Sequence, residues 1–218
     1  MNVGFSNLTS LKAQLLGPQL RAKTDWDDRI ETIGLGVQAS FENYCNRKFA
    51  RTVNDQQIIS ADRVEFSLER YPIESVSLIE LKLTEQDGWQ QLDAPPWQVL
   101  QTIDTKPGLV RFPEDDDVGP YYAQVRFTYT GGYWWSILDQ GDAGYPDAQP
   151  AGSAIVPNDL LFAWQMQCRK VWEAIDKIGD KIVTVGSNAK NPSEVMAGLD
   201  LIPQVKKSLG SYIRTSFA

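Results

Sequence analysis

The chain has 218 residues, of which 42% are hydrophobic and 22% charged, a composition that allows a full hydrophobic core and excludes disorder throughout. No window approaches the roughly 18 consecutive apolar residues of a membrane span, and residues 1–16 lack a basic start followed by an apolar run, so we expect neither membrane insertion nor secretion. Histidine is absent, which excludes Ser-His and Cys-His nucleophile pairs and every zinc site that contains histidine.

The net charge of -7 disfavours nonspecific binding to a nucleic-acid backbone or an anionic membrane. It is concentrated between Phe112 and Cys168, where Arg126 is the only base. The eight acids there are Glu114, Asp115, Asp116, Asp117, Asp139, Asp142, Asp147 and Asp159. After Asp200 the chain carries bases only, at Lys206, Lys207 and Arg214.

Three helices are predicted around a central β region. The first covers residues 7–16, and the second follows an N-cap at Thr24 and runs to about Tyr44. The second helix has an apolar stripe formed by Trp26, Ile30, Ile33, Val37, Phe41 and Tyr44. Gly34 and Gly36 inside it predict close approach of another backbone segment.

The β region consists of short runs of β-prone residues separated by turn residues. They are Ile58-Ile59, 64–68, 76–78, 79–83, 109–112 and 124–130. These runs predict a small, mostly antiparallel sheet. A long loop then extends from Trp134 to Val156, a length that is often functional.

The third helix opens at Pro157 and is expected to end at Gly179, and a short terminal helix is predicted at 203–212. The pattern indicates an α+β fold with helices packed beside the sheet. We expect one domain over 1–180 and a C-terminal extension over 181–218.

The two cysteines, Cys45 and Cys168, fall in helical patterns and are interpreted as core residues; a reactive thiolate would need a nearby cation such as Arg47 or Arg169.

Five segments, in their order, resemble the head-to-tail connector (adaptor, or head-completion) family of long-tailed bacteriophages. They are Leu8-Thr9-Ser10-Leu11-Lys12, Glu42-Asn43-Tyr44-Cys45-Asn46-Arg47 at a helix end, Arg70-Tyr71-Pro72-Ile73-Glu74-Ser75-Val76, Tyr129-Thr130-Gly131-Gly132-Tyr133, and Val156-Pro157-Asn158-Asp159-Leu160. The resemblance covers about residues 8–180. The connection from Tyr133 to Pro157 is longer than is usual in the family, and the segment after Gly179 has no matching pattern.

The resemblance implies a structural virion protein without enzymatic activity or cofactor. It implies a homo-oligomeric ring, expected to be dodecameric, below the portal protein and above a tail or stopper protein at the virion head-tail junction. DNA would pass through the ring without specific binding, no membrane is involved, and assembly would take place in the host cytoplasm. The alternative function is a carbohydrate-binding or adhesive β-rich module, suggested by seven tryptophans and an aromatic loop.

Three groups of residues are candidate sites. The acidic group Glu114, Asp115, Asp116 and Asp117 is interpreted as channel-facing, although a solvated turn or a divalent-cation site would have the same composition. The aromatic group Tyr133, Trp134, Trp135 and Tyr145 is interpreted as a loop interface, the alternatives being packing on the parent domain and a ligand site.

The third group is a portal-docking arm, and its alternative is a last helix folded on the protein's own core. Its residues are Lys206, Lys207, Leu209, Tyr212, Ile213, Arg214 and Phe217. A paired-carboxylate hydrolase is suggested only by Glu65, Glu69 and Glu74, which lie near Arg63 and Arg70. Solvated strand faces produce such pairs routinely.

Overall fold

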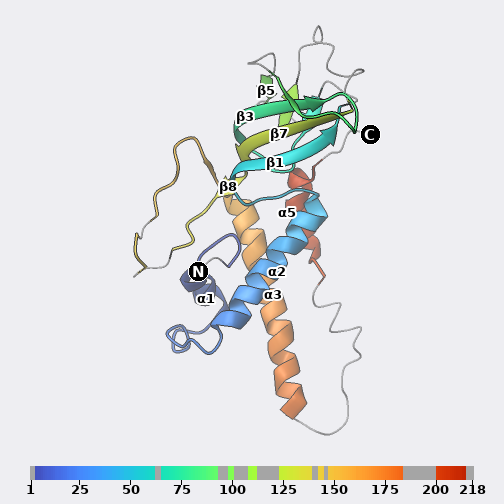
Figure 1. The fold of residues 1–218 in the computed structure, drawn as a ribbon. Coiled ribbons are helices and arrows are strands. Elements are labelled where there is room, and N and C mark those ends of the chain that lie inside the picture. The colour runs from blue at the N-terminus through green and yellow to red at the C-terminus, as the bar shows by residue number, and fades with distance from the viewer. Residues whose placement is uncertain are drawn as a thin grey trace. The chain divides into compact units, whose positions relative to one another are not determined.

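The chain has an α+β fold, seen in a computed structural model that describes most of its residues (Figure 1). The described residues are 3–61, 65–92, 98–100, 108–111, 123–138, 142–144, 147–183 and 200–214. The chain forms two compact units. Unit 1 comprises Met1–Cys45, Trp135–Gln149 and Val156–Ile213, and unit 2 comprises Asn46–Trp134, Pro150–Ile155 and Arg214–Ala218.

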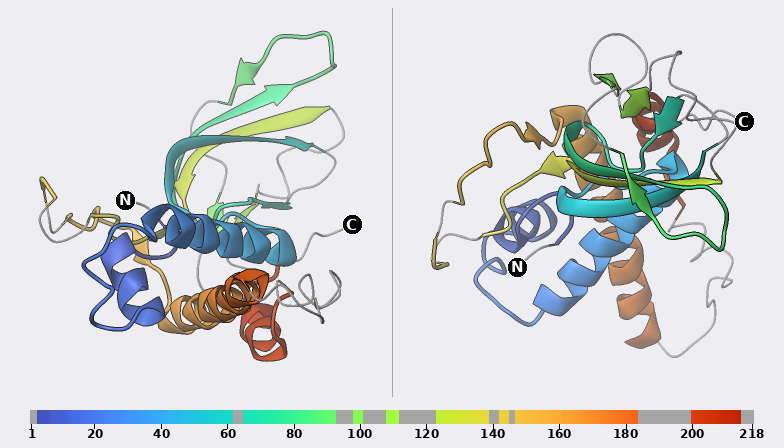
Figure 2. Two further views of the ribbon diagram at one scale, coloured as in Figure 1. Left: turned by 90° about the horizontal axis from the view of Figure 1, so that it is seen from below. Right: turned by 45° about the horizontal axis from the view of Figure 1, so that its top comes forward.

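Unit 1 is helical. Its elements are α1 (Leu8–Leu15), α2 (Asp27–Cys45), α3 (Asn158–Val183), α5 (Pro203–Leu209) and the 3₁₀ turn η1 (Gly210–Tyr212). Helices α2 and α3 pack side by side, and α5 packs on α3 (Figure 2). The predicted helices are therefore confirmed. The expected boundary at residue 180 does not coincide with the fold, because α3 continues through it and α5 belongs to the same unit.

The ends of the helices differ in part from the prediction. The Asn7 side chain caps α1, its Oδ1 accepting a hydrogen bond of 2.9 Å from the Ser10 amide. Helix α2 begins at Asp27 rather than directly after Thr24, whose carbonyl accepts from the Asp27 amide in the preceding turn. The prediction that Gly179 ends α3 was wrong: the glycine lies inside the helix, where it lowers helix propensity without interrupting the hydrogen bonds.

The buried side of α2 follows the predicted stripe except at its two ends, since Trp26 lies before the helix and is only partly buried. Ile30, Ile33, Val37 and Phe41 are buried, but the next buried residue is Cys45, and Tyr44 is 38% exposed. By helical spacing both Tyr44, three residues after Phe41, and Cys45, four residues after it, fall on the buried face, so the spacing does not account for the exposure of Tyr44. Cys168 on α3 is also buried, so both cysteines are core residues as predicted.

Of the two glycines in α2, only Gly34 has a backbone segment against it. A Cβ atom at this position would overlap the carbonyl oxygen of Val3 and would lie 3.1 Å from a methyl group of Leu11. The Gly34 carbonyl also accepts a 3.0 Å hydrogen bond from the indole nitrogen of Trp164. Gly36 has nothing within 4 Å of its Cβ position, so the prediction of close approach was right for Gly34 and wrong for Gly36.

Unit 2 is built on a four-stranded antiparallel sheet with the order β1-β7-β3-β4 (Figure 1). Its strands are β1 (Thr52–Ser60), β7 (Gln124–Gly131), β3 (Ile73–Lys82) and β4 (Gln90–Gln91). The runs predicted as separate strands at 76–78 and 79–83 form the single strand β3, because no turn residue divides them.

The described part of unit 2 also contains two smaller sheets. The first, antiparallel, has the order β2 (Glu65–Ser67), β6 (Leu109–Arg111), β5 (Gln98–Leu100), and the second pairs β8 (Tyr133–Trp134) with β9 (Ala154–Ile155) in parallel. The core lies on one face of β7, where Val125, Phe127 and Tyr129 are fully buried at alternate positions. Phe66 of β2 packs on Phe127 with ring centroids 5.3 Å apart.

Candidate functional site

The aromatic group predicted as a loop interface is divided between the two units. Tyr133 and Trp134 form β8 in unit 2 and are partly exposed. Trp135 is only 9% exposed in unit 1 and makes an edge contact with Phe5 at 5.4 Å between ring centroids. This corrects the expectation for Trp135, which packs on its own unit; a buried indole is also not available to stack on a sugar. Tyr145 lies outside the described residues.

The backbone holds Tyr133 against the start of unit 2. The Tyr133 amide donates to the Phe49 carbonyl at 2.7 Å, and the Arg51 amide donates to the Tyr133 carbonyl at 2.9 Å. Gly132 before it has a φ of 96°, and a Cβ there would lie 2.6 Å from the Ala50 carbonyl oxygen. The Gly131-Gly132-Tyr133 motif thus has a structural reason: only glycine fits between these two backbone segments.

Among the described residues of unit 2, Arg47 is the most deeply buried cation, with 3% of its surface exposed. Its guanidinium carbon lies 3.2 Å from the Tyr71 ring centroid, 4.7 Å from Phe49 and 5.4 Å from Tyr133, and one terminal nitrogen donates to the Tyr71 carbonyl. Burial lowers the pKa of this arginine from its ordinary value. The aromatic rings therefore supply, through cation–π contacts, the stabilisation that a carboxylate usually provides.

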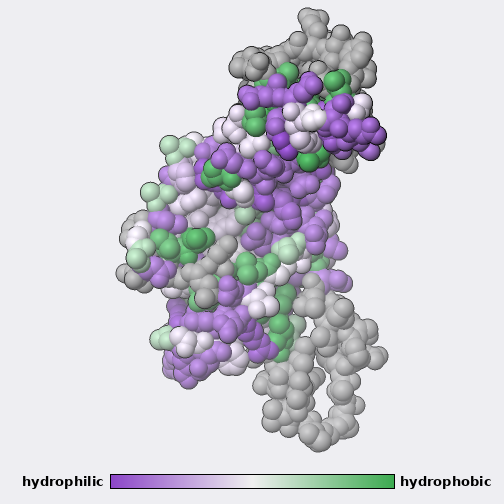
Figure 3. Space-filling model, viewed as in Figure 1, coloured by the Kyte–Doolittle hydropathy of each residue, from purple (hydrophilic) through white to green (hydrophobic). Residues whose placement is uncertain are grey.

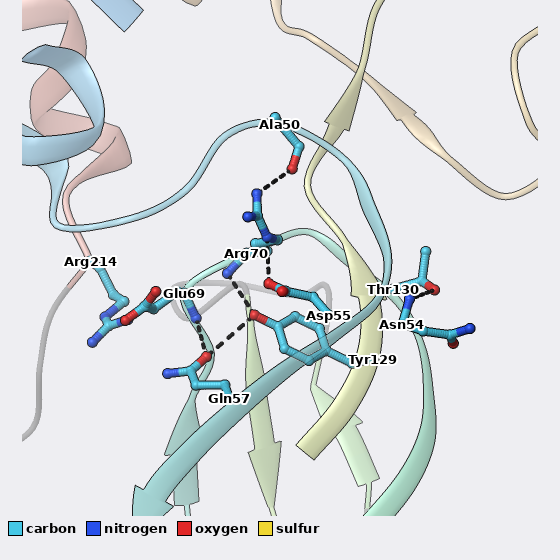
Figure 4. A network of polar contacts seen from close by, with 9 residues as sticks. All are labelled: Ala50, Asn54, Asp55, Gln57, Glu69, Arg70, Tyr129, Thr130 and Arg214. Carbon is cyan, nitrogen blue, oxygen red and sulfur yellow. Dashed lines mark hydrogen bonds and ion pairs between the residues drawn. The ribbon is translucent and has the colours of Figure 1, made fainter. Parts of the chain in front are cut away.

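A second arginine, Arg70, connects β1 to the turn before β3 (Figure 4). Its Nε donates to the Asp55 carboxylate at 2.5 Å, and a terminal nitrogen donates to the Ala50 carbonyl at 2.8 Å. The Arg70 amide donates to the Tyr129 hydroxyl at 3.1 Å, and that hydroxyl donates to Gln57 Oε1 at 3.3 Å. These bonds hold together the segments around Asp55, Arg70 and Tyr129, which are far apart in the sequence.

The Tyr129 hydroxyl at the centre of this network has a pKa raised to about 12. Burial is the main cause, because it disfavours the phenolate, and the nearby Asp55 carboxylate acts in the same direction. The Arg70 amide acts against both. The network is thus neutral at this oxygen, and its role is to position the β1 edge and the 69–71 turn.

The acidic group at residues 114–117, predicted to face a channel, lies outside the described residues. Within the described part of the chain no group of three or more Cys, Asp or Glu residues is arranged to hold a metal ion. No described helix is long and apolar enough to cross a membrane.

The three carboxylates that suggested a hydrolase each face an arginine. Glu74 accepts from Arg51 at 2.7 and 3.0 Å, which raises the pKa of that arginine, and Glu65 pairs with Arg111. Glu69 lies 3.8 Å from Arg214. Glu65 and Glu74 lie on strands and Glu69 in the turn between β2 and β3, so ion pairs with arginines account for all three carboxylates.

The described part of the C-terminal segment is folded. Val205 and Leu209 of α5 are fully buried, and the Leu209 carbonyl lies 3.8 Å from Cys45 Sγ. The Gln167 side chain of α3 bonds both Asp200 and Ile202, and Tyr212 donates to Asp159 at 2.7 Å. This burial corrects the expectation that Leu209 is a docking anchor. It agrees with the alternative interpretation, in which the last helix folds on the protein's own core.

The other residues of the proposed arm differ in exposure. Lys206, Lys207 and Ile213 are exposed, whereas Tyr212 and Arg214 are partly buried. Phe217 lies outside the described residues. The basic side chains of α5 therefore point to solvent while its apolar side chains stabilise unit 1, so the two can be tested separately.

Hydrophilic residues cover much of the face drawn in Figure 3, with smaller hydrophobic areas among them. Among the described residues the most exposed large hydrophobic side chains are Phe162 of α3, Ile155 of β9, and Val53 and Ile58 of β1. The two residues on β1 are notable because they lie on the edge strand of a sheet.

Comparison with solved structures identifies the fold. The chain is similar to one in the neck of an empty gene transfer agent (GTA) particle computed with C6 symmetry, with a TM-score of 0.53 and 13% identity over 100% of this chain and 95% of the other. It is also similar to a chain in the virion of a native GTA particle, with a TM-score of 0.52 and 13% identity over 97% and 90%. No family model and no curated protein sequence matches.

Proposed function

We propose that this protein is a structural component of a phage-like head-tail junction, where it forms a ring below the portal that joins capsid to tail and extends the DNA channel. The observation that carries the proposal is the agreement of two independent similarities. One is the ordered set of sequence segments that resembles phage connectors, and the other is a fold shared along the whole chain with a protein in a GTA neck.

A closed ring is the arrangement that a neck position requires. The similar neck was computed with C6 symmetry, and both six and twelve copies in a ring are compatible with sixfold symmetry. We favour twelve, the number that the family resemblance implies. The tail or stopper protein is proposed to bind the opposite side of the ring from the portal, and assembly is proposed to take place in the host cytoplasm.

The decisive experiment locates the protein in particles. Electron microscopy of tailed particles, and of the purified protein mixed with its portal, is expected to show it as a collar directly below the portal. A position on the capsid surface or at the tail tip would refute the function. A dilute protein that is monomeric agrees with it, since a weakly cohesive ring assembles on its template.

Portal docking is proposed to use the basic surface of α5. Replacing Lys206 and Lys207 by glutamate reverses two exposed charges without touching buried Val205 or Leu209. We expect an unchanged free energy of unfolding, within about 0.5 kcal/mol, and at least a tenfold loss of binding to portal-containing heads. Unchanged binding would exclude these lysines from the docking surface, and Lys170→Glu on α3 is a matched exposed control.

The acidic group at residues 114–117 is proposed to face the channel. Packaged DNA must slide past the lining, and a negative lining repels phosphate, so DNA does not adhere to the conduit. Replacing Asp115, Asp116 and Asp117 by asparagine is expected to leave ring assembly intact and to slow genome ejection. Normal ejection kinetics from a normally formed ring would contradict this role.

A further inference from the structure

The two edges of the main sheet in unit 2 are complementary in direction. Strand β1 forms one edge and β4 the other. Every neighbouring pair in the order β1-β7-β3-β4 is antiparallel, so β1 and β4 run in opposite directions. If copies follow one another in the same orientation around a ring, β1 of one copy can meet β4 of the next as an antiparallel pair, the more stable kind of ladder.

The edge formed by β1 has little protection against pairing. Edge strands usually carry lysine or proline, but β1 contains neither and its only charged residue, Asp55, is paired with Arg70 at 2.5 Å. A bulge near Asn54, whose φ is 53°, limits regular pairing to the residues that follow. In that regular part Ile58 is 54% exposed. Residues 56–60 are therefore an uncharged edge with an apolar side chain available for contact.

The opposite edge is also uncharged. Gln90 and Gln91 of β4 are exposed, and one row of the sheet runs from Ile58 through Arg126 and Glu80 to Gln91. The charged pair lies inside this row, because Arg126 binds Glu80 with two bonds of 2.6 Å. The row thus presents an isoleucine at one end and an amide at the other, so no like charges oppose each other when the ends of two copies meet.

We propose that β1 of one copy pairs with β4 of the next, so that the ring contains a continuous antiparallel sheet. The occupant of the β1 edge is a second copy because this same chain supplies the complementary edge, and a head-to-tail contact of two different surfaces forms a ring when the rotation between copies closes. The inference rests on the ring assembly of the proposed function. It adds the surface that joins the subunits.

Disulfide cross-linking of the full-length chain tests this contact. Cysteine replaces Ile58 in combination with either Gln90 or Gln91, while the native Cys45 and Cys168 are buried. Within one copy the two engineered sites are three strand spacings apart, about 14 Å, whereas a disulfide needs Cα atoms about 4.4 to 6.8 Å apart. Any disulfide between them therefore joins different copies. We expect oxidation at high protein concentration to give a ladder of covalent dimers, trimers and larger species.

Single variants provide the controls. A mixture of Ile58→Cys with Gln91→Cys is expected to give covalent dimers and nothing larger, because each copy then has one engineered thiol. Dimers of Ile58→Cys alone would indicate twofold pairing of β1 with β1 and would overturn the proposal. So would the lack of any ladder from both double variants when they are oxidised in rings assembled with the portal. Rings without a ladder would leave the proposed function standing, whereas a position away from the neck would refute the function itself.

Discussion

Replacing Gly34 by alanine is expected to destabilise the protein by about 1 to 3 kcal/mol or more, whereas replacing Gly36 by alanine is expected to stabilise it by about 0.5 to 1 kcal/mol. The two glycines lie two residues apart in α2 and differ in what faces them. A methyl group at position 34 would overlap the Val3 carbonyl, and Val3 is itself fully buried, so the segment has no free space into which to move. A methyl group at position 36 would meet open space.

Urea denaturation of the wild type and the two variants, monitored by tryptophan fluorescence, measures both effects. Trp164, whose indole nitrogen donates to the Gly34 carbonyl, is fully buried in the same unit and reports on its packing. Alanine has the same advantage in helix propensity over glycine at both positions. The difference in the free energy of unfolding between the two variants therefore measures the cost of the steric overlap at position 34. Equal stabilities of the two variants would show that the Val3 segment does not pack on α2 in solution.

The helices of unit 1 could be predicted because their apolar period is long and regular. The stripe of α2 and the amphipathic pattern of α3 identify the buried faces without any knowledge of their partners. The errors lie where a long-range contact decides. Tyr44 and Trp135 are both large aromatic residues, and nothing local indicates that the first would be exposed and the second would pack on Phe5.

The predicted β-prone runs correspond to β1, β2, β3, β6 and β7 of unit 2, whereas the short strands β4, β5, β8 and β9 were not predicted. The order of the strands could not be predicted either. Alternation at Val125, Phe127 and Tyr129 indicates a strand with one buried face, and it contains no information on which strands lie on either side. The strand order places β1 at an edge of the sheet, so that the exposed Ile58 becomes available for contact with another strand. In the sequence alone, Ile58 is one β-prone residue among many.

The polar network around Arg70 was also beyond the reach of the sequence. Its members Asp55, Arg70 and Tyr129 are separated by up to 74 positions, and each has a routine local interpretation as a strand or turn residue. In the sequence, Arg47 is only a possible activator of Cys45. Its burial among aromatic rings becomes apparent once the fold brings Tyr71 and Tyr133 to it.

Replacing Tyr129 by phenylalanine is expected to destabilise the protein at neutral pH by about 1 to 3 kcal/mol, since the Arg70 amide loses its acceptor inside the network. The same substitution is expected to change the pH dependence of stability. Because the pKa of Tyr129 is about 12 in the folded protein, above the ordinary 10.0, the folded state holds the phenolic proton more tightly than the unfolded state.

The stability that this phenol contributes through its raised pKa is complete below about pH 10 and is lost as the pH rises through about 12. By pH 12 this titration lowers the stability of the wild type by about 2 kcal/mol, and the variant, which has no phenol at this position, does not undergo this loss. Free energies of unfolding for both proteins from about pH 8 to 12 provide the measurement, and their difference removes every titration that they share. The gap between wild type and Tyr129→Phe should therefore narrow as the pH rises. A constant gap would mean that the hydroxyl is exposed to water in solution and that the network does not hold the turn at Arg70 to β7.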